Sequence, residues 1–446
     1  MDKVYKIQNV SGASLPDGEE FRQLLESKDV QKAIGRAQEK YLPWQEFRLK
    51  SWVPKDKEKV WSLVRLQRRF SCTQTPIRDK DGNLYTFNPR SHVQFLHEVD
   101  LELGGNFMGV SDFSESDRRQ IIRRNLIEES IASSRLEGAN TAREVARRML
   151  HEGRKPLNKD EQMIVNNHEV MKRIEEDIKN EELSIDLLKD LHKQVTKGTL
   201  STAELEGTFR ETLDEKGNRL KVMPWDEQTI AYITPDREFV EKELPKFIEF
   251  ANDRGETEFI HPLTKAIMLH FWIGLLHPFE DGNGRLARIL FYWYMLRKGY
   301  WAFSYLSLSE RIVKSPKQYA MAYIYSEQDG YDLNYFIHYN MMKLKLARQQ
   351  FQKYLEEKIY ENKQSIKIIQ SGYNFNLRQL RLLQYLAKGE QRYTTLSSYH
   401  NINNEVGYIT AASDLKKLVS GGFLRKIKNG RNVYYYPTEK IRTLIK

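Results

Sequence analysis

Two apolar runs separated by a short polar loop constrain the fold of this chain more than any other feature. The first run, "AIMLHFWIGLL", ends at Leu276, and the second, "LARILFYWYML", begins at Leu286. A helix that is apolar on every side must be buried all round, so we expect a core helix over 263–276. Both runs are shorter than the roughly 20 residues that cross a bilayer, and charged side chains interrupt them.

The polar loop between the runs, "HPFEDGNGR" (277–285), has the composition of an anion site. Pro278 discourages continuation of the first helix. The Gly-Asn-Gly triplet at 282–284 tolerates left-handed backbone, so its N–H groups can converge on an anion. We expect the next helix to start near Arg285, with its dipole and free N–H groups directed at the same place.

Charged side chains around this loop support the same interpretation. Arg285 and Arg288 share one face of the first helical turn, where positive charge opposes the helix dipole unless an anion binds. Asp281 offers an oxygen ligand for Mg²⁺, and His277 is suited to move a proton at neutral pH. Each part alone is commonly structural: a helix end, a turn or a surface pair. Together they indicate phosphoryl-type transfer.

The segment "HPFEDGNGRLAR" resembles the Fic family signature, His-x-Phe-x-(Asp/Glu)-Gly-Asn-Gly-Arg-x-x-Arg, at every specified position. The resemblance extends over the helical body, about 113–345. It implies a mainly α fold, a Fic-type helical bundle with a small β-hairpin flap. It also implies transfer of AMP from ATP to a side-chain hydroxyl of a protein, with release of pyrophosphate.

The resemblance assigns a role to each residue of the motif. His277 would deprotonate the target hydroxyl, Asp281 would bind Mg²⁺, and Arg288 would hold the γ-phosphate. Phe279 would anchor the loop in the core. The α- and β-phosphates would be cradled by Gly282, Asn283 and Gly284, helped by Arg285. The kinase-like branch of the family has lysine at the position of Gly284, so the sequence is similar to the adenylyl-transferring branch.

A second stretch, "SSRLEG", matches the Fic inhibitory motif (Ser/Thr)-x-x-x-Glu-(Gly/Asn). We expect Ser133 and Glu137 on one face of a helix over about 116–138, closed by Gly138. By resemblance, Glu137 would pair with Arg288 and withhold it from the γ-phosphate. In some relatives the same glutamate supports removal of AMP. Taken alone, the six residues are equally consistent with an ordinary helix end.

Two further assignments rest on position in the family rather than on a motif. The hairpin before "ITPD" corresponds to the flap, which pins a target segment by strand addition. Its nucleotide-facing residues would be Thr229, Ile230, Ala231 and Tyr232. Tyr319 would stack on adenine. Relatives often have a second tyrosine where this chain has Ala320, which leaves the adenine pocket open.

The C-terminal segment carries most of the net charge of +10. Residues 371–446 contain 13 Lys and Arg against 4 Asp and Glu, a net charge of +9. The predicted order of helix, short helix, helix and Asn-Gly hairpin over 373–446 resembles the winged helix-turn-helix domains of transcription regulators. Duplex DNA is one expected partner, with wing phosphate contacts from Arg425, Lys426, Lys428 and Arg431. Protein contacts and a solvated basic surface are the alternatives.

We therefore predict four parts. They are an α+β adaptor (1–112) with an Asp-Gly hairpin in "IRDKDGNLYTF", the Fic core (113–345), a connecting helix (346–372) and the winged helix (373–446). A single cysteine, Cys72, and an N-terminus without a signal-peptide pattern favour a soluble cytoplasmic protein. A homodimer is also expected from the family.

The functional hypothesis is an autoinhibited protein adenylyltransferase that uses ATP and Mg²⁺. It would modify a Ser, Thr or Tyr hydroxyl of a target protein, which could be the chain itself. One alternative is a DNA-binding transcription regulator that uses the Fic core as a nucleotide sensor. Another is an enzyme that removes AMP. A sensor needs no general base, so the complete set from His277 to Arg288 favours an enzyme.

Overall fold

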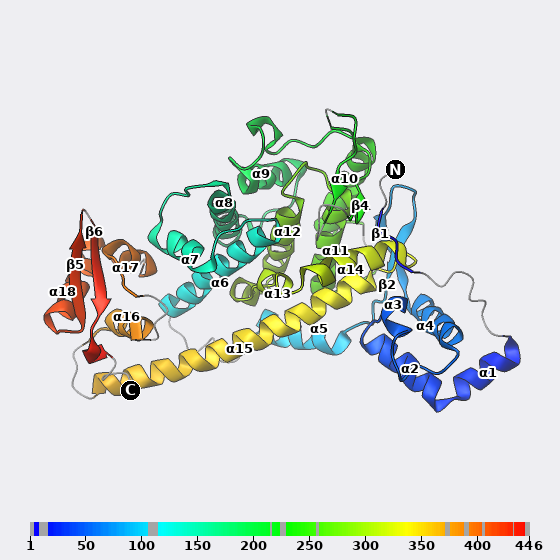
Figure 1. The fold of residues 1–446 in the computed structure, drawn as a ribbon, viewed down its shortest axis with the longest axis horizontal. Coiled ribbons are helices and arrows are strands. Elements are labelled where there is room, and N and C mark those ends of the chain that lie inside the picture. The colour runs from blue at the N-terminus through cyan, green and yellow to red at the C-terminus, as the bar shows by residue number, and fades with distance from the viewer. Residues whose placement is uncertain are drawn as a thin grey trace.

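The computed structural model of the chain is mainly helical. It describes residues 4–8, 17–105, 115–214, 216–223, 229–255, 258–370, 375–387, 392–403, 406–430 and 432–441. Strands in these ranges form three two-stranded antiparallel sheets. The N-terminal region and the C-terminal helices lie at opposite ends of the helical core, and one long helix, α15, runs beneath it (Figure 1).

The centre of the core is the helix pair that the apolar runs predict. Helix α11 (Pro262–Leu276) and helix α12 (Asn283–Arg297) pack side by side. Nearly every side chain of both helices is buried, including Trp272 and Trp293. The prediction of a core helix over 263–276 is confirmed. Burial of so much apolar surface, at about 25 cal/mol per Å², makes this pair the main hydrophobic contribution to the fold.

Other helices pack around this pair (Figure 1). The preceding helices are α6 (Glu115–Leu136), α7 (Arg143–Glu152), α8 (Lys159–Arg173), η2 (Ile174–Ile178), α9 (Ile185–Thr196), η3 (Ala203–Leu205) and α10 (Arg237–Ala251). Those that follow are η4 (Trp301–Tyr305), α13 (Ser309–Ile312) and α14 (Pro316–Gln328). The expected flap hairpin consists of β3 (Lys221–Val222) and β4 (Tyr232–Ile233).

The N-terminal region is α+β. Its first four helices share a hydrophobic cluster of their own, whereas its hairpin and the helices after the hairpin contribute buried residues to the central core. Its elements are α1 (Gly18–Glu26), α2 (Lys28–Glu39), α3 (Trp44–Phe47), α4 (Lys57–Ser71), β1 (Thr73–Arg78), β2 (Leu84–Phe87), α5 (Val93–Val99) and η1 (Asp100–Gly105). Strands β1 and β2 form the expected hairpin, and Gly82 in its turn has φ +86. Arg68 fastens the region to α15 by donating to the Tyr335 hydroxyl at 2.8 Å.

The connecting helix is longer than the sequence pattern predicts. Helix α15 spans Asn334–Gln370, so the expected boundary between core and connector at 345/346 falls inside one helix. Its first turns carry buried apolar residues that belong to the central core, such as Phe336 and Met341. Among its described side chains, the charged stretch that follows keeps only scattered buried apolar residues of this core, Leu344, Phe351 and Leu355, so charged residues dominate its sequence pattern.

The C-terminal elements follow the order that the sequence predicts. They are α16 (Leu377–Ala387), α17 (Leu396–Ile402), α18 (Tyr408–Ser420), β5 (Leu424–Asn429) and β6 (Asn432–Pro437). Their classification as a winged helix stays a prediction. Arg425, Lys426 and Lys428 are exposed on β5, and Arg431 lies outside the described residues. None of the helices in the described ranges combines the length and apolar character needed to cross a membrane.

A buried ion pair near the end of α10 generates a stability prediction. Lys265, which is 0% exposed, donates to Asp253 at 2.6 Å, and the Tyr294 hydroxyl donates to the same carboxylate at 2.7 Å. Asp253→Asn would leave the buried ammonium without its carboxylate. We expect it to lower the free energy of unfolding by about 3 kcal/mol at pH 7 in urea denaturation. Glu241→Gln in an exposed pair with Arg237 should cost under about 1 kcal/mol.

The same pair predicts an acid-dependent loss of stability. Burial alone would raise the pKa of Asp253, but hydrogen bonds from Lys265, Lys298 and Tyr294 outweigh it and lower that pKa to about 2. The contribution is therefore complete above the ordinary Asp pKa of about 4 and is lost as pH falls from 4 to 2. Wild type and Asp253→Asn should converge in stability over that window. A constant difference between them would contradict the assignment.

Candidate functional site

The loop between α11 and α12 begins and ends in left-handed backbone. His277 closes α11 with φ 46 and ψ 56, and Gly282 precedes α12 with φ +83. Helix α12 starts at Asn283, two residues before Arg285, near which the sequence predicts its start, so Gly282 is the left-handed residue of the triplet. A Cβ atom at Gly282 would lie 2.6 Å from Thr196 Cγ2. The N–H groups of the first turn of α12 therefore open on the space above the loop.

Asn283 holds the loop in this shape. Its side-chain amide donates to the Phe279 carbonyl at 2.8 Å, and its carbonyl oxygen accepts from the Phe279 N–H at 3.0 Å. The Asn283 side chain is buried, so it acts here as a brace, and its predicted contribution to the phosphate cradle would come from its backbone N–H. Phe279 is fully buried. This environment agrees with the expected role of Phe279 as an anchor.

His192 on α9 is a site residue that sequence reasoning missed. Its ring stacks on Phe279 with a centroid separation of 3.6 Å. Its Nδ1 accepts from the Gly207 N–H at 3.0 Å, so Nε2 carries the proton and donates to the Asp281 carbonyl at 2.8 Å. Burial lowers the pKa of His192 to about 4. The available signal was weak, a lone histidine on the apolar face of a predicted helix.

Arg285 is a fully buried guanidinium with open donors. One terminal nitrogen donates to the Val195 carbonyl at 2.8 Å. Its Nε and its other terminal nitrogen have no hydrogen-bond partner among the described residues, and the Asp281 carboxylate is 3.9 Å from the latter. Buried polar groups are nearly always satisfied in proteins. An anionic guest is therefore the natural partner for these donors.

Arg288 is also buried and is held by Ser133 and Glu137. It donates to Ser133 Oγ at 2.8 Å, to the Ser133 carbonyl at 3.0 Å and to Glu137 Oε1 at 2.9 Å. The expected Glu137–Arg288 ion pair is thus present. The expected position of Glu137 on a helix face is wrong, because α6 ends at Leu136 and Glu137 lies in the turn that follows. Gly138, with φ +95, completes that turn.

The Glu137 carboxylate also covers the first turn of α12. A Cβ atom at Gly284 would lie 2.2 Å from Glu137 Oε1, so only glycine leaves room for the carboxylate in this position. The carboxylate therefore occupies the space that faces both Arg288 and the α12 N-terminus. An anion bound to those groups would compete with Glu137 for the same volume and the same donors.

His277 is a neutral base at physiological pH. Burial, with a contribution from the positive charge of Arg210, lowers the pKa of His277 to about 4. Its Nδ1 lies 3.4 Å from the Gly274 carbonyl, a contact in which Nδ1–H donates and Nε2 remains an acceptor. Arg210 fixes the backbone here, because its Nε donates to the His277 carbonyl at 2.7 Å. An oriented, unprotonated imidazole is suited to general base catalysis.

Asp281 is the carboxylate at the mouth of the site, and its side chain is 50% exposed. No group of three or more His, Cys, Asp and Glu side chains that could hold a metal occurs in the described part of the chain. Mg²⁺ is commonly held by one or two carboxylates together with substrate phosphates and water. One accessible carboxylate beside an anion site fits that donor set.

The flap lies against the end of α11. The Tyr232 hydroxyl donates to the Leu275 carbonyl at 2.9 Å, while Ile230 and Ala231 are buried. The outer edge of the flap is covered by the N-terminal segment, because the Tyr5 N–H donates to the Ile230 carbonyl at 2.8 Å. The nucleotide-facing role expected for these flap residues, together with Thr229, stays a prediction.

Tyr319 lies beneath the site within an aromatic cluster. Its hydroxyl is 2.7 Å from His270 Nε2, and its ring packs on Tyr323 and Phe336. Burial raises the pKa of Tyr319, and the charge of nearby Arg288 opposes that shift. Ala320 is buried on the same helix. Stacking of Tyr319 on adenine stays a prediction.

By its fold and site, the chain is a helical protein in which two buried arginines, Arg285 and Arg288, lie beside the neutral imidazole of His277. Residues 182–295 match the Fic/DOC family. The chain therefore contains a Fic domain, as its motif predicted, within a mainly α fold.

Named relatives share this domain. The chain is 32% identical over 121 residues to the protein adenylyltransferase fic-1 of Caenorhabditis elegans, a match that covers 27% of this chain and 21% of that protein. It is 30% identical over 122 residues to the protein adenylyltransferase Fic of Nematostella vectensis, which covers 27% and 25%. The chain thus spans about a quarter or less of these relatives. A Fic family protein from Desulfovibrio desulfuricans aligns with TM-score 0.48 at 15% identity, over 79% of this chain and 98% of that one.

The buried His192 generates a prediction about pH. His192→Phe keeps a ring against Phe279 but removes both hydrogen bonds, which should cost about 2 kcal/mol at pH 7.5. Because the folded-state pKa of His192 is about 4, below the ordinary 6.5, wild type loses stability as pH falls from 6.5 to 4. The variant should lose less over that range in urea unfolding followed by circular dichroism. Parallel pH profiles would show that His192 does not titrate as described.

Proposed function

We propose that the protein transfers AMP from ATP to a hydroxyl side chain of a target protein. The observation that carries the proposal is the convergence of three features on one space. They are the open donors of buried Arg285, the N-terminus of α12 and the neutral base His277. The Fic domain, and its relatives named as protein adenylyltransferases, support the same reaction.

In the proposed reaction, His277 Nε2 takes the proton of the target hydroxyl. The hydroxyl oxygen forms a bond to the α-phosphorus of ATP, and the bond from that phosphorus to the bridging oxygen of pyrophosphate breaks. Arg285 and the first-turn N–H groups of α12 stabilise the charge that develops on the phosphate oxygens. Arg288 holds the γ-phosphate, so that the leaving group is aligned for attack.

Asp281 would hold Mg²⁺ against the phosphates in this scheme. When bound, Mg²⁺ would neutralise phosphate charge and orient the leaving group. The protein's own contribution is the geometry of the loop, which Asn283 and His192 brace from both sides.

The ion pair between Glu137 and Arg288 is proposed to restrain this activity. Wild type would bind ATP without its γ-phosphate on Arg288, because the Glu137 carboxylate already pairs with a terminal nitrogen of that guanidinium. Release of Glu137 would permit the productive pose. The same carboxylate beside the phosphates could instead activate water for removal of AMP, which makes the reverse reaction the alternative that this contact supports.

His277→Ala should abolish AMP transfer while leaving the fold intact, because the variant lacks the imidazole that takes the proton of the target hydroxyl. The measurement is incorporation of label from α-labelled ATP into the protein itself or into lysate proteins. We expect a fall of at least about a hundredfold. His97→Ala, on an exposed histidine of α5, is the control and should retain full activity. Retained labelling in His277→Ala would exclude the proposed base.

Glu137→Gly should raise self-labelling about tenfold or more above wild type, because it frees Arg288 for the γ-phosphate. Glu137→Gly combined with Arg288→Ala should return to the low level, since the freed arginine is then absent. Equal labelling of wild type and Glu137→Gly would contradict the restraint. Loss of AMP from a labelled protein with wild type, but not with Glu137→Gly, would establish removal as the activity.

A DNA-binding regulator is a second candidate, supported by the exposed cations of β5. Arg425, Lys426 and Lys428 occupy that strand, and Ile409 on α18 is 88% exposed. Such a regulator would bind duplex DNA through residues 373–446 with strong salt dependence. DNA binding by such a regulator would be unchanged in His277→Ala, whereas AMP transfer by the Fic domain would be lost in that variant.

A further inference from the structure

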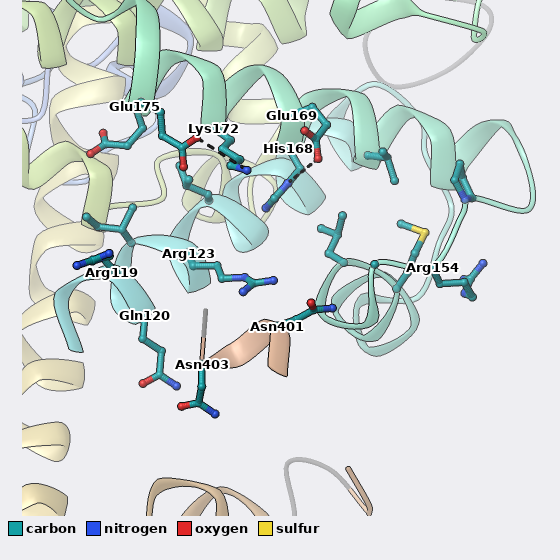
Figure 2. A pocket seen from close by; sticks show the side chains of 18 of the residues that line it. Arg119, Gln120, Arg123, Arg154, His168, Glu169, Lys172, Glu175, Asn401 and Asn403 are labelled. Atoms are coloured by element: carbon teal, nitrogen blue, oxygen red, sulfur yellow. Dashed lines mark ion pairs between the residues drawn. The ribbon is translucent and has the colours of Figure 1, made fainter. Parts of the chain in front are cut away.

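A cavity of about 890 Å³ lies between the Fic core and the C-terminal helices, away from the anion site described above. Figure 2 shows it walled by α6, α8, the turn after α7, and the segment around Asn401 and Asn403. Its volume falls within the range of small-molecule sites, roughly 300–1,000 Å³. Nothing in the proposed reaction uses this cavity.

The cavity lining combines positively charged side chains with an apolar wall. Among the described residues, seven Lys and Arg side chains line the cavity against three Glu. Apolar side chains provide part of the wall, among them Ile122, Leu126, Leu150 and Val165. An apolar surface bordered by cations suits a compact molecule with an apolar or planar body and an anionic group.

Several of the cations are held in place from outside the cavity. Arg154 makes two hydrogen bonds to the Glu161 carboxylate, at 2.8 and 2.9 Å. Arg378 on α16 donates to Asp414 at 3.0 Å. Because these partners fix the arginines, less conformational entropy is lost when a ligand binds.

His168 offers an unsatisfied polar group at the same place. Both of its ring nitrogens are buried and lack a hydrogen bond within the described ranges, and its Nδ1 lies 3.7 Å from Glu169. Figure 2 shows His168 and Arg123 directed into the cavity from α8 and α6. Burial is the main cause that lowers the pKa of neighbouring His151 to about 4, and the positive charges of Arg123 and Arg147 add to it.

We propose that this cavity binds a small phosphorylated molecule with an apolar or planar body, as a regulatory site separate from the reaction site. The apolar wall favours such a molecule over a DNA backbone, which presents only phosphates and sugars to a protein surface. Arg123 and His168 would contact the phosphate, and Arg381 would close the site from the C-terminal side.

The position of the cavity would allow a bound ligand to affect the ion pair between Glu137 and Arg288 through helix α6. Helix α6 lines the cavity with Arg119 and Arg123, and the same helix carries Ser133, which holds Arg288. Arg123 and Ser133 are ten residues apart, about 15 Å along a rigid helix. The C-terminal helices contact α7 as well, where Asn401 donates to the His151 carbonyl at 3.0 Å. This regulatory role rests on the proposed function, whereas binding does not.

The test uses the full-length protein and the fluorescent dye ANS, an aromatic sulfonate with an apolar body. We expect saturable binding that weakens roughly tenfold in Arg123→Gln. Lys155→Gln/Lys172→Gln changes two exposed side chains of the lining, so it should weaken binding without affecting folding. Arg148→Gln, on an exposed arginine of α7 outside the lining, should bind ANS as wild type does. Thermal melting checks that each variant is folded.

Competition then separates the possible sites. ATP should displace ANS equally from wild type and from Arg288→Ala, because the cavity does not include Arg288. Unchanged ANS binding in the folded cavity variants would overturn the proposal. Loss of displacement in Arg288→Ala would place the dye at the reaction site, and displacement by duplex DNA but not by ATP would assign the cavity to DNA. Either of these two displacement results would also overturn the proposed regulatory site. AMP transfer plays no part in these measurements, so its absence would leave them valid.

Discussion

Two buried guanidinium groups in an otherwise apolar helix are the constraint on which the site depends. Arg285 and Arg288 are 0% and 1% exposed, on one of the two helices at the centre of the core. Removing such charges from water is costly unless they are paired and hydrogen-bonded. The Ser133–Glu137 turn supplies acceptors for Nε and one terminal nitrogen of Arg288, while the other terminal nitrogen of Arg288 and two nitrogens of Arg285 have no hydrogen-bond partner among the described residues. The fold therefore leaves buried positive charge at the N-terminal end of α12, which an anion would stabilise.

The loop between α11 and α12 is held in place by hydrogen bonds from separate elements. Asn283 closes it on itself, Arg210 fixes its entry at the His277 carbonyl, and His192 fixes its exit at the Asp281 carbonyl. The His277 imidazole, the open donors of Arg285 and the Asp281 carboxylate are thus set at defined positions around the loop. Preorganisation of this kind lets electrostatic stabilisation act without reorganisation during the reaction.

Much of this arrangement follows from local sequence, and the exceptions have physical reasons. The core helix over 263–276 and the hairpin at Gly82 are local patterns of hydrophobicity and turn chemistry. The start of α12 at Asn283 was not predictable, because the side-chain bonds between Asn283 and Phe279 decide it. The end of α6 before Glu137 was missed because α-helical spacing alone cannot show where the last turn opens. His192 comes from α9, and its role exists only once Phe279 lies against it.

The sequence by itself determined the chemical inventory: an apolar helix pair, a motif with a base, an acid and two arginines, and a basic C-terminal segment. These depend on residue type and spacing over a few turns of chain. Only the tertiary structure decided which histidine braces the loop, which donors of Arg285 stay open, and that the C-terminal helices enclose a cavity against α6 and α8. Those outcomes depend on contacts between segments far apart in the chain, where burial and the competition for hydrogen-bond donors select the partners.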